Sequence, residues 1–240
     1  MITIDGNWVL EGLEKEDPSR VKTSDELSEL IDEIGFLPLF KNTVPGFSVE
    51  EHTATKGWWG GKSEEDPWDW REVIAEEGQI AYGKLFGNRA GFISKEWYPF
   101  YACYRRDGYD FDSRYEDGLA SFRTKKIMDI MKLYEALPSN ELKALAGFNK
   151  DGEKGFESAV SLLQMQTYLT VRRFRRRSNK KHEEYGWSVA HYCFSEKLFG
   201  EEYVRSAYHL NPSEAKQKII RQVQLKFPEA QVSEIEKVIR

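Results

Sequence analysis

Apolar residues recur at helical spacing in several segments of the chain, and each segment is bounded by a residue that can cap a helix. The first segment is 25–34, where Ser24 is a suitable N-cap and Gly35 a suitable end. Its apolar positions are Leu27, Leu30, Ile31 and Ile34. Because residues three and four apart lie on one face of a helix, this pattern predicts an amphipathic helix that is buried on one side.

Other parts of the first half combine a helix with two strands. Asp66 followed by Pro67 is a strong helix start, and it predicts a helix to about Glu77. Segments 80–86 and 90–93 are predicted as strands joined at Gly87-Asn88. The polar segment 105–118 indicates a loop between two modules.

The second half shows the element order of a winged helix, a fold that commonly binds DNA. The predicted elements are a helix over 121–137, a helix over 141–146 capped by Ser139, a turn over 149–155, a helix over 156–169, and strands from about Thr170 and over 187–194. Asn211-Pro212-Ser213-Glu214 then starts another helix, and a last short helix follows it. We therefore expect an N-terminal extension over 1–23, modules over 24–118 and 119–200, and C-terminal helices over 201–240.

Composition is that of a globular protein, with 240 residues of which 40% are hydrophobic. No apolar run is long enough to span a bilayer, and no signal peptide is recognisable. Two cysteines, Cys103 and Cys193, with no zinc-type spacing, favour a reducing cytoplasm. We expect no metal, no other cofactor and no membrane partner.

Charge is distributed unevenly along the chain, whose net charge is −5. Residues 1–140 hold 17 Lys and Arg against 27 Asp and Glu, whereas residues 141–240 hold 18 against 13. An acidic protein does not coat nucleic acid indiscriminately, but one cationic face can still steer it to an anionic partner.

The strongest candidate for such a face is a basic run within 171–181. Its cationic residues are Arg172, Arg173, Arg175, Arg176, Arg177, Lys180 and Lys181. On a wing strand, Arg173, Arg175 and Arg177 would share one face, and Arg172 and Arg176 would lie on the other with Phe174. This pattern indicates binding to the phosphates of double-stranded DNA. The alternative is a solvated surface, or pairing with the acidic first module.

Two further groups are candidates for contact with DNA. The helix over 156–169 presents on its predicted outer face Ser161, Gln164, Met165 and Tyr168, of which a glutamine can bond adenine. The tryptophan cluster consists of Trp58, Trp59, Trp68 and Trp70, which would stack on an extruded base. The alternatives are an ordinary solvated helix face and a core plug under a loop.

Four segments together resemble the AlkZ-related bacterial proteins, relatives of the AlkZ-type winged-helix DNA glycosylases. The segments are 35–40, 82–94, 139–148 and 163–169. The resemblance implies an α+β, helix-rich fold of tandem winged-helix modules that holds duplex DNA. Enzymes of that type excise bulky alkylated bases.

The catalytic signature of those enzymes is Gln, an apolar residue, then Asp or Gln, and it would fall on Pro38-Leu39-Phe40 here. Neither polar side chain is present to position a water. Gln164-Met165-Gln166 has the letters of the signature but lies in a predicted helix, where side chains two apart diverge. Glu50, Glu51 and His52 follow the expected place and are the remaining candidates, with a solvent-facing turn as the alternative.

Three hypotheses follow from the sequence. The chain is a diverged glycosylase that binds DNA, or a noncatalytic DNA-binding or regulatory module, or a protein-interaction scaffold that uses its basic wing.

Overall fold

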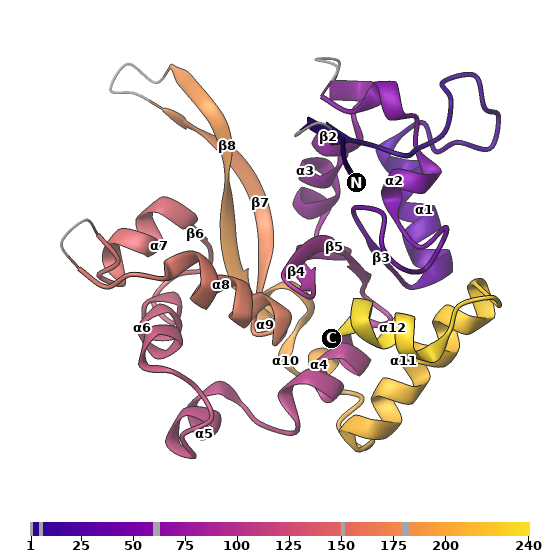
Figure 1. Cartoon of the computed structure of the whole chain (residues 1–240). Coiled ribbons are helices and arrows are strands. Elements are labelled where there is room, and N and C mark those ends of the chain that lie inside the picture. The colour runs from indigo at the N-terminus through magenta and orange to yellow at the C-terminus, as the bar shows by residue number, and fades with distance from the viewer. Residues whose placement is uncertain (1, 5–6, 60–62, 150–151, 179–182) are drawn as a thin grey trace.

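The computed structural model describes residues 2–4, 7–59, 63–149, 152–178 and 183–240. The fold is α+β, and its centre is an antiparallel sheet of six strands (Figure 1). The strand order is β3-β5-β4-β7-β8-β6, and β1 and β2 form a separate pair. Strand bounds are β1 Ile2–Ile4, β2 Asn7–Val9, β3 Phe36–Pro38, β4 Ile80–Phe86, β5 Arg89–Ser94, β6 Leu137–Pro138, β7 Leu169–Ser178 and β8 Glu184–Phe194.

The helices of the first half confirm the predicted caps Gly35 and Asp66 but not Ser24. The N-cap of α1 is Thr23, one residue before the expected Ser24, and Gly35 ends the helix with φ of 99°. Asp66 caps α3, where its carboxylate accepts a hydrogen bond from the Trp68 amide. The bounds are α1 Ser24–Ile34, α2 Val49–His52, η1 Thr55–Gly57, η2 Ser63–Glu65, α3 Pro67–Glu77, α4 Tyr98–Arg106 and α5 Phe111–Glu116.

The second half follows the predicted order of three helices and two strands, although two of its helices are shorter than expected. The bounds are α6 Phe122–Met131, α7 Ser139–Leu145, α8 Phe156–Met165, α9 Ser195–Phe199, α10 Glu201–Val204, α11 Pro212–Lys226 and α12 Val232–Ile239. The predicted extension of the first helix to 137 is wrong, because Leu137 and Pro138 pair with β8 instead. The Asn211–Glu214 capping box is present at the start of α11.

The sheet joins the two predicted modules. Tyr82 of β4 pairs with Val171 of β7, and Thr170 Oγ1 donates to the Tyr82 carbonyl at 3.0 Å. One continuous hydrophobic core contains residues from both sides of the expected boundary, such as Leu37 and Leu169. The division at residue 118 stays a prediction about folding units, but the core and the sheet cross it.

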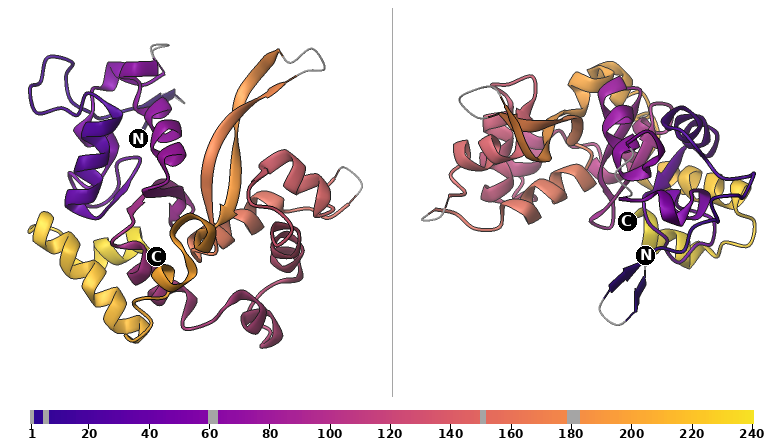
Figure 2. Two further views of the ribbon diagram at one scale, coloured as in Figure 1. Left: turned by 180° about the vertical axis from the view of Figure 1, so that it is seen from behind. Right: turned by 90° about the horizontal axis from the view of Figure 1, so that it is seen from above.

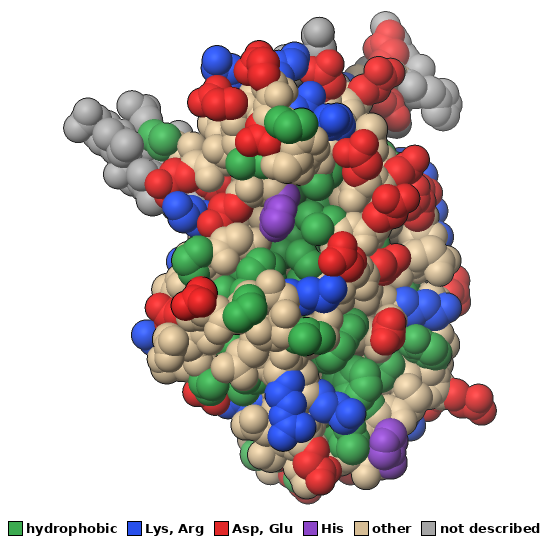
Figure 3. Space-filling view, turned by 90° about the vertical axis from the view of Figure 1, so that its right-hand side faces the viewer, with side chains coloured by type: hydrophobic (Ala, Val, Ile, Leu, Met, Phe, Trp, Pro, Cys, Tyr) green, Lys and Arg blue, Asp and Glu red, His purple; other side chains and the backbone are tan. Residues whose placement is uncertain are grey.

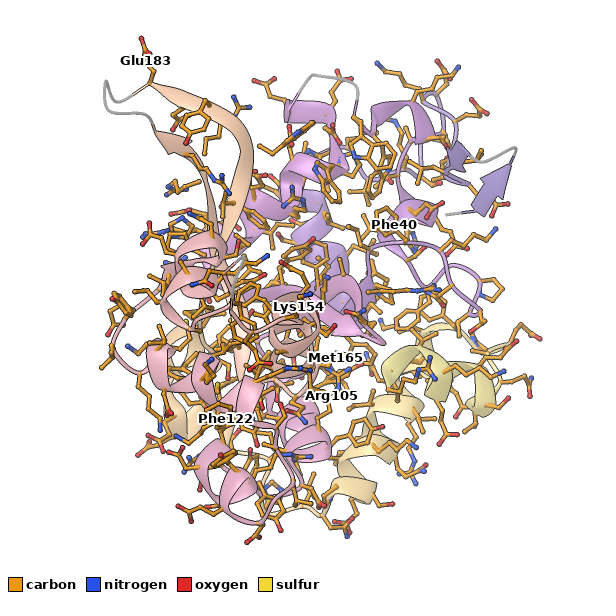
Figure 4. The ribbon with its side chains drawn as sticks, turned by 60° about the vertical axis from the view of Figure 1, so that its left-hand side comes forward. Phe40, Arg105, Phe122, Lys154, Met165 and Glu183 are labelled. Atoms are coloured by element: carbon orange, nitrogen blue, oxygen red, sulfur yellow. The ribbon has the colours of Figure 1, made fainter. Side chains whose placement is uncertain are left out.

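The outer parts of β7 and β8 leave the body as a two-stranded arm, defined as 173–178 with 184–190. Helices α6, α7 and α8 lie on one side of it, and α1 and α3 lie on the other (Figures 1 and 2). Figure 4 shows Glu183 at the end of the arm. The opposite side of the molecule, seen in Figure 3, mixes acidic and basic side chains around apolar ones. Among the described residues, no helix combines the length and the apolar character needed to cross a bilayer.

Candidate nucleic-acid interface

Two arginines of the basic run are tied to the end of α3. Arg172 Nη1 donates to the Glu76 carbonyl oxygen at 2.8 Å. Arg175 Nη2 donates to Glu76 Oε1 at 2.8 Å, and its Nη1 lies 2.7 Å from Glu76 Oε2. The last carbonyls of a helix carry partial negative charge, so cations are favoured there. For Arg175, the structure shows the alternative of pairing with the acidic first module, because its partner Glu76 belongs to that module.

Three other arginines of the arm form no ion pair within the described ranges, although the charge of Arg173 helps to lower the pKa of the Glu76 carboxyl. Arg173 is half-buried and stands opposite His191, whereas Arg176 and Arg177 are exposed. Lys180 and Lys181 lie outside the described residues. The arginines of the basic run therefore divide into two that hold the arm to α3 and three that form no ion pair with a described carboxylate.

A bulge in β8 shapes the outer part of the arm. Pairing passes from Arg175↔Val189 to Arg177↔Tyr185, so three residues of β8 lie opposite Arg176 alone. Gly186 accommodates this with φ of 72°, a conformation that glycine adopts without strain. The side chain of Trp187 is left 86% exposed. Because the indole ring is exposed, a planar ligand can stack on it.

A cavity of about 450 Å³ lies between α3 and the arm, and we call it the arm–α3 cavity. Its lining includes the tryptophans Trp59, Trp68 and Trp187, the acids Asp66, Asp69 and Glu72, and Arg176. Burial raises the pKa of the Asp66 carboxyl above its ordinary value. Trp187 and the three acids were not predicted as members of one site, since α3 and β8 are more than a hundred residues apart.

The wall of the cavity is fixed by Arg71. Its guanidinium lies 4.0 Å from the Trp68 ring centroid and 4.3 Å from that of Phe174, between α3 and β7. Arg71 Nη2 donates to Glu72 Oε1 at 3.1 Å, and the Ser188 hydroxyl donates to the same oxygen. These contacts join the arm to α3, so the two sides of the cavity are held in one arrangement.

Of the four predicted cluster tryptophans, two belong to the core and two line the cavity. Trp58 and Trp70 are buried, and their indole N–H groups donate to Thr53 Oγ1 and to the Glu64 carbonyl. Trp59 is half exposed, and it faces the cavity with Trp68. The core plug therefore describes the first pair, and only the second pair is placed to stack on a ligand.

The expected outer face of the helix over 156–169 is wrong. Gln164 is 2% exposed, its Oε1 accepts from the Lys84 amide at 3.0 Å, and its Nε2 donates to the Val160 carbonyl. Tyr168 and Ser161 are also buried, and Tyr168 donates to the Tyr109 carbonyl. The face turns inward because β4 packs on it, and the polar groups of Gln164 and Tyr168 find backbone partners there. Neither residue can read a groove of DNA from this position.

The place of the expected catalytic signature is occupied by apolar residues. Pro38 is the last residue of β3, Leu39 is buried, and Phe40 is half-buried. Glu50 is buried, where its carboxylate accepts from the Glu11 and Lys41 amides.

The two residues after Glu50 also serve the local fold. Glu51 accepts from Ser48 Oγ at 2.6 Å and from the Gly46 amide at 2.9 Å. His52 Nε2 lies 2.8 Å from the Gly46 carbonyl oxygen. The expected solvent-facing turn is wrong for Glu50, and all three side chains hold the segment that follows β3.

A mixed α+β fold with an antiparallel central sheet and a projecting two-stranded arm is the class that this geometry defines. A family model described as AlkZ related matches residues 21–240, and the chain belongs to the AlkZ-related family. No curated protein matches the chain. Among solved structures it is similar to Streptomyces sahachiroi DNA glycosylase AlkZ, with 11% identity and a TM-score of 0.45 over 86% of this chain. The match covers 52% of that protein, so the chain spans about half its length.

Proposed function

We propose that this protein binds duplex DNA and that the arm of β7 and β8 makes the principal contact. The observation that carries the proposal is the division of the basic run, in which Arg173, Arg176 and Arg177 lie on the arm and form no ion pair with a described carboxylate. Phosphate oxygens would supply the negative charge that these guanidinium groups lack. In this proposal α6, α7 and α8 form the helical part of a winged helix, and the arm is its wing.

Such contacts would position the protein on DNA without reading its sequence, since phosphates are the same at every base pair. Membership of the AlkZ-related family supports a nucleic acid as the partner. The acidic first half of the chain would keep nonspecific binding weak away from the arm.

The test is fluorescence anisotropy with a short duplex across a salt series. The triple variant Arg173→Ala/Arg176→Ala/Arg177→Ala should reduce the log–log salt slope by about 2 to 3, at about 0.9 per phosphate contact. The charge-matched control Lys22→Ala/Lys218→Ala/Arg221→Ala removes three exposed cations elsewhere and should leave the slope unchanged. Equal effects of the two variants would refute the arm as the contact, and salt-sensitive self-association without DNA binding would favour an interaction scaffold.

A second candidate function is recognition of a damaged base in the arm–α3 cavity. Trp59, Trp68 and Trp187 offer flat apolar surfaces, on which a base turned out of the duplex would stack. Asp66, Asp69 and Glu72 favour a base that carries positive charge, such as a purine alkylated at N7. The cavity therefore supports a diverged glycosylase more specifically than the place of the absent signature does.

Within that candidate, Asp69 is the acid best placed to act on a water. Glu72 is paired with Arg71, and Asp66 caps α3, whereas no described cation pairs with Asp69. The measurement is release of an N7-alkylated base from duplex DNA at enzyme excess, for the native protein and for Asp69→Asn. Release that Asp69→Asn abolishes supports this role, and no release by the folded native protein leaves DNA binding as the function.

A further inference from the structure

A second cavity of about 370 Å³ lies between the β4–β5 turn and the end of α12, and we call it the α12 cavity. It is separate from the arm–α3 cavity and shares no lining residue with it. Phe40, which is labelled in Figure 4, and Phe86 contribute aromatic surface. Its cationic lining residues are Arg89, Lys237 and Arg240.

The β4–β5 turn places Arg89 at the rim. Gly87 and Asn88 both have positive φ, at 54° and 67°, as a tight two-residue hairpin turn requires. The Gly87 amide donates to the Arg240 carbonyl oxygen at 3.2 Å, and the Arg240 side chain lies over Gly87. The turn and the end of α12 are thus joined directly, and their cations converge although they are about 150 residues apart in the sequence.

The three cationic side chains at this rim have no acidic side chain as a partner within the described part of the chain. Arg89, Lys237 and Arg240 are exposed and form no ion pair with a described acidic side chain, and the cavity lining contains no Asp or Glu. The two acids of α12 are engaged elsewhere. Glu234 accepts from the Gln231 amide, and Glu236 pairs with Lys216 at 2.6 Å.

A fourth cationic side chain, Arg105, lies next to the residues that line the α12 cavity. Arg105 Nη2 donates to the Ile239 carbonyl at 3.0 Å and also to the Leu85 carbonyl, each one residue before a residue of the lining. Its Nε and Nη1 are buried without a hydrogen-bond partner among the described residues. The sulfur of Met165, which is labelled with Arg105 in Figure 4, accepts from the Asn88 amide of the same turn. The guanidinium offsets the partial negative charge of the last carbonyls of α12, which would otherwise repel an anion.

We propose that the α12 cavity binds a phosphate group. Two guanidinium groups and an ammonium on one concave surface match the several oxygens of a phosphate, and arginine can bond two of them at once. The aromatic surface beside them fits the sugar or base of a phosphate ester. The phosphate would come either from a free nucleotide or from the DNA backbone. This inference stands apart from the arm, because no residue of the arm lines the cavity.

The first experiment is isothermal titration of the full chain with inorganic phosphate and with a deoxynucleoside monophosphate, at ionic strength held constant with chloride. Arg89→Ala and Arg240→Ala should each weaken the phosphate interaction roughly tenfold, as the loss of a charge-assisted hydrogen bond does. The control Lys22→Ala/Lys218→Ala/Arg221→Ala should leave it unchanged.

The second experiment separates the two sources of phosphate. In the DNA salt series, Arg89→Ala/Lys237→Ala/Arg240→Ala lowers the slope by about 2 to 3 if the cavity holds the DNA backbone. If the source is a free nucleotide, the triple variant keeps the native salt slope for DNA and loses only the binding of phosphate and nucleotide. The proposal is overturned when the triple variant, shown folded by circular dichroism, changes neither measurement. A failure of the arm proposal shows instead as an unchanged slope in the arm variant, so the two results are distinguishable.

Discussion

Arg175 of β7 and Glu76 of α3 form a two-pronged ion pair, with distances of 2.8 and 2.7 Å between guanidinium nitrogens and carboxylate oxygens. The pair closes one side of the arm against the body. Because Arg175 is paired with Glu76, it is not available to bind a DNA phosphate.

Replacing Glu76 with Gln should tighten DNA binding several-fold, because Arg175 is then released as a further phosphate contact. The expected salt slope is steeper by about 0.9 than that of the native protein. Anisotropy across a salt series measures it, and Glu77→Gln is the neighbouring control. An unchanged slope would mean that Arg175 stays on α3 without its partner.

The same pair predicts a small dependence of stability on pH. The Arg175 guanidinium holds the pKa of Glu76 below its ordinary value of 4.5. A depressed carboxyl pKa stabilises the folded protein above pH 4.5, and this contribution is lost as the pH falls through the folded pKa. Both side chains are more than a third exposed, so the free energy of unfolding should fall by less than about 1 kcal/mol in Glu76→Gln. Urea unfolding at pH 7 and pH 3 should show this difference only at pH 7.

His191 predicts a dependence of DNA binding on pH. Burial lowers its pKa below 6.5, and the charges of Arg173 and Arg175 lower it further. Phosphates bound at Arg173 would offset part of that positive charge, so the pKa of His191 rises in the complex. Binding then takes up a proton, and affinity increases as the pH falls from 7.5 to 5.5, by roughly two- to fivefold. The variant His191→Gln should lose this increase, and a native protein whose affinity is flat over the same range would contradict the placement of DNA beside Arg173.

Glu50 should prove structural. Its replacement by Ala leaves the Glu11 and Lys41 amides without their acceptor, and we expect the free energy of unfolding to fall by about 2 to 4 kcal/mol. Glu29→Ala removes an exposed acid of α1 as the control. Chemical denaturation measures both. A Glu50→Ala protein of native stability that has lost an activity would restore the carboxylate as a catalytic candidate.

Gly83 and Gln164 should be energetically coupled. A Cβ at residue 83 would lie 2.7 Å from Gln164 Oε1, which is held in place by the Lys84 amide. Gly83→Ala should therefore cost about 1 to 3 kcal/mol, and Gln164→Ala a similar amount for the amide left unpaired. The double variant should cost less than the sum, as a cycle of urea unfolding measurements would show. Simple additivity would mean that β4 moves away from α8 instead.

Local signals in the sequence predicted most elements of the fold. Asp66-Pro67, Gly35 and the Asn211–Glu214 capping box each fix a helix end through contacts within a few residues, so the bounds were predictable. The hairpin at Gly87-Asn88 is equally local. The pairing of β4 with β7 was not predicted, because contacts between residues about ninety positions apart leave no periodic pattern in either strand.

The candidate site was predictable only in part for the same reason. The density of the basic run is visible in the sequence, but its division depends on Glu76, which belongs to another element. Trp187 carries no local mark of exposure, since the β8 bulge that exposes it is defined by its register against β7. Gln164 was misplaced because one polar residue on a helix face does not reveal that a strand will cover it.

The junction between β4 and β7 has a consequence for how this protein can be dissected. A cut near residue 118 would leave β4 and β7 each with an unpaired edge of backbone amides and carbonyls, and such edges template aggregation. Fragments ending there should be recovered as insoluble material unless both are present together. When both fragments are expressed together as separate chains, they should assemble into a complex. The Tyr82–Val171 pairing between β4 and β7 would then form part of the interface between the two fragments.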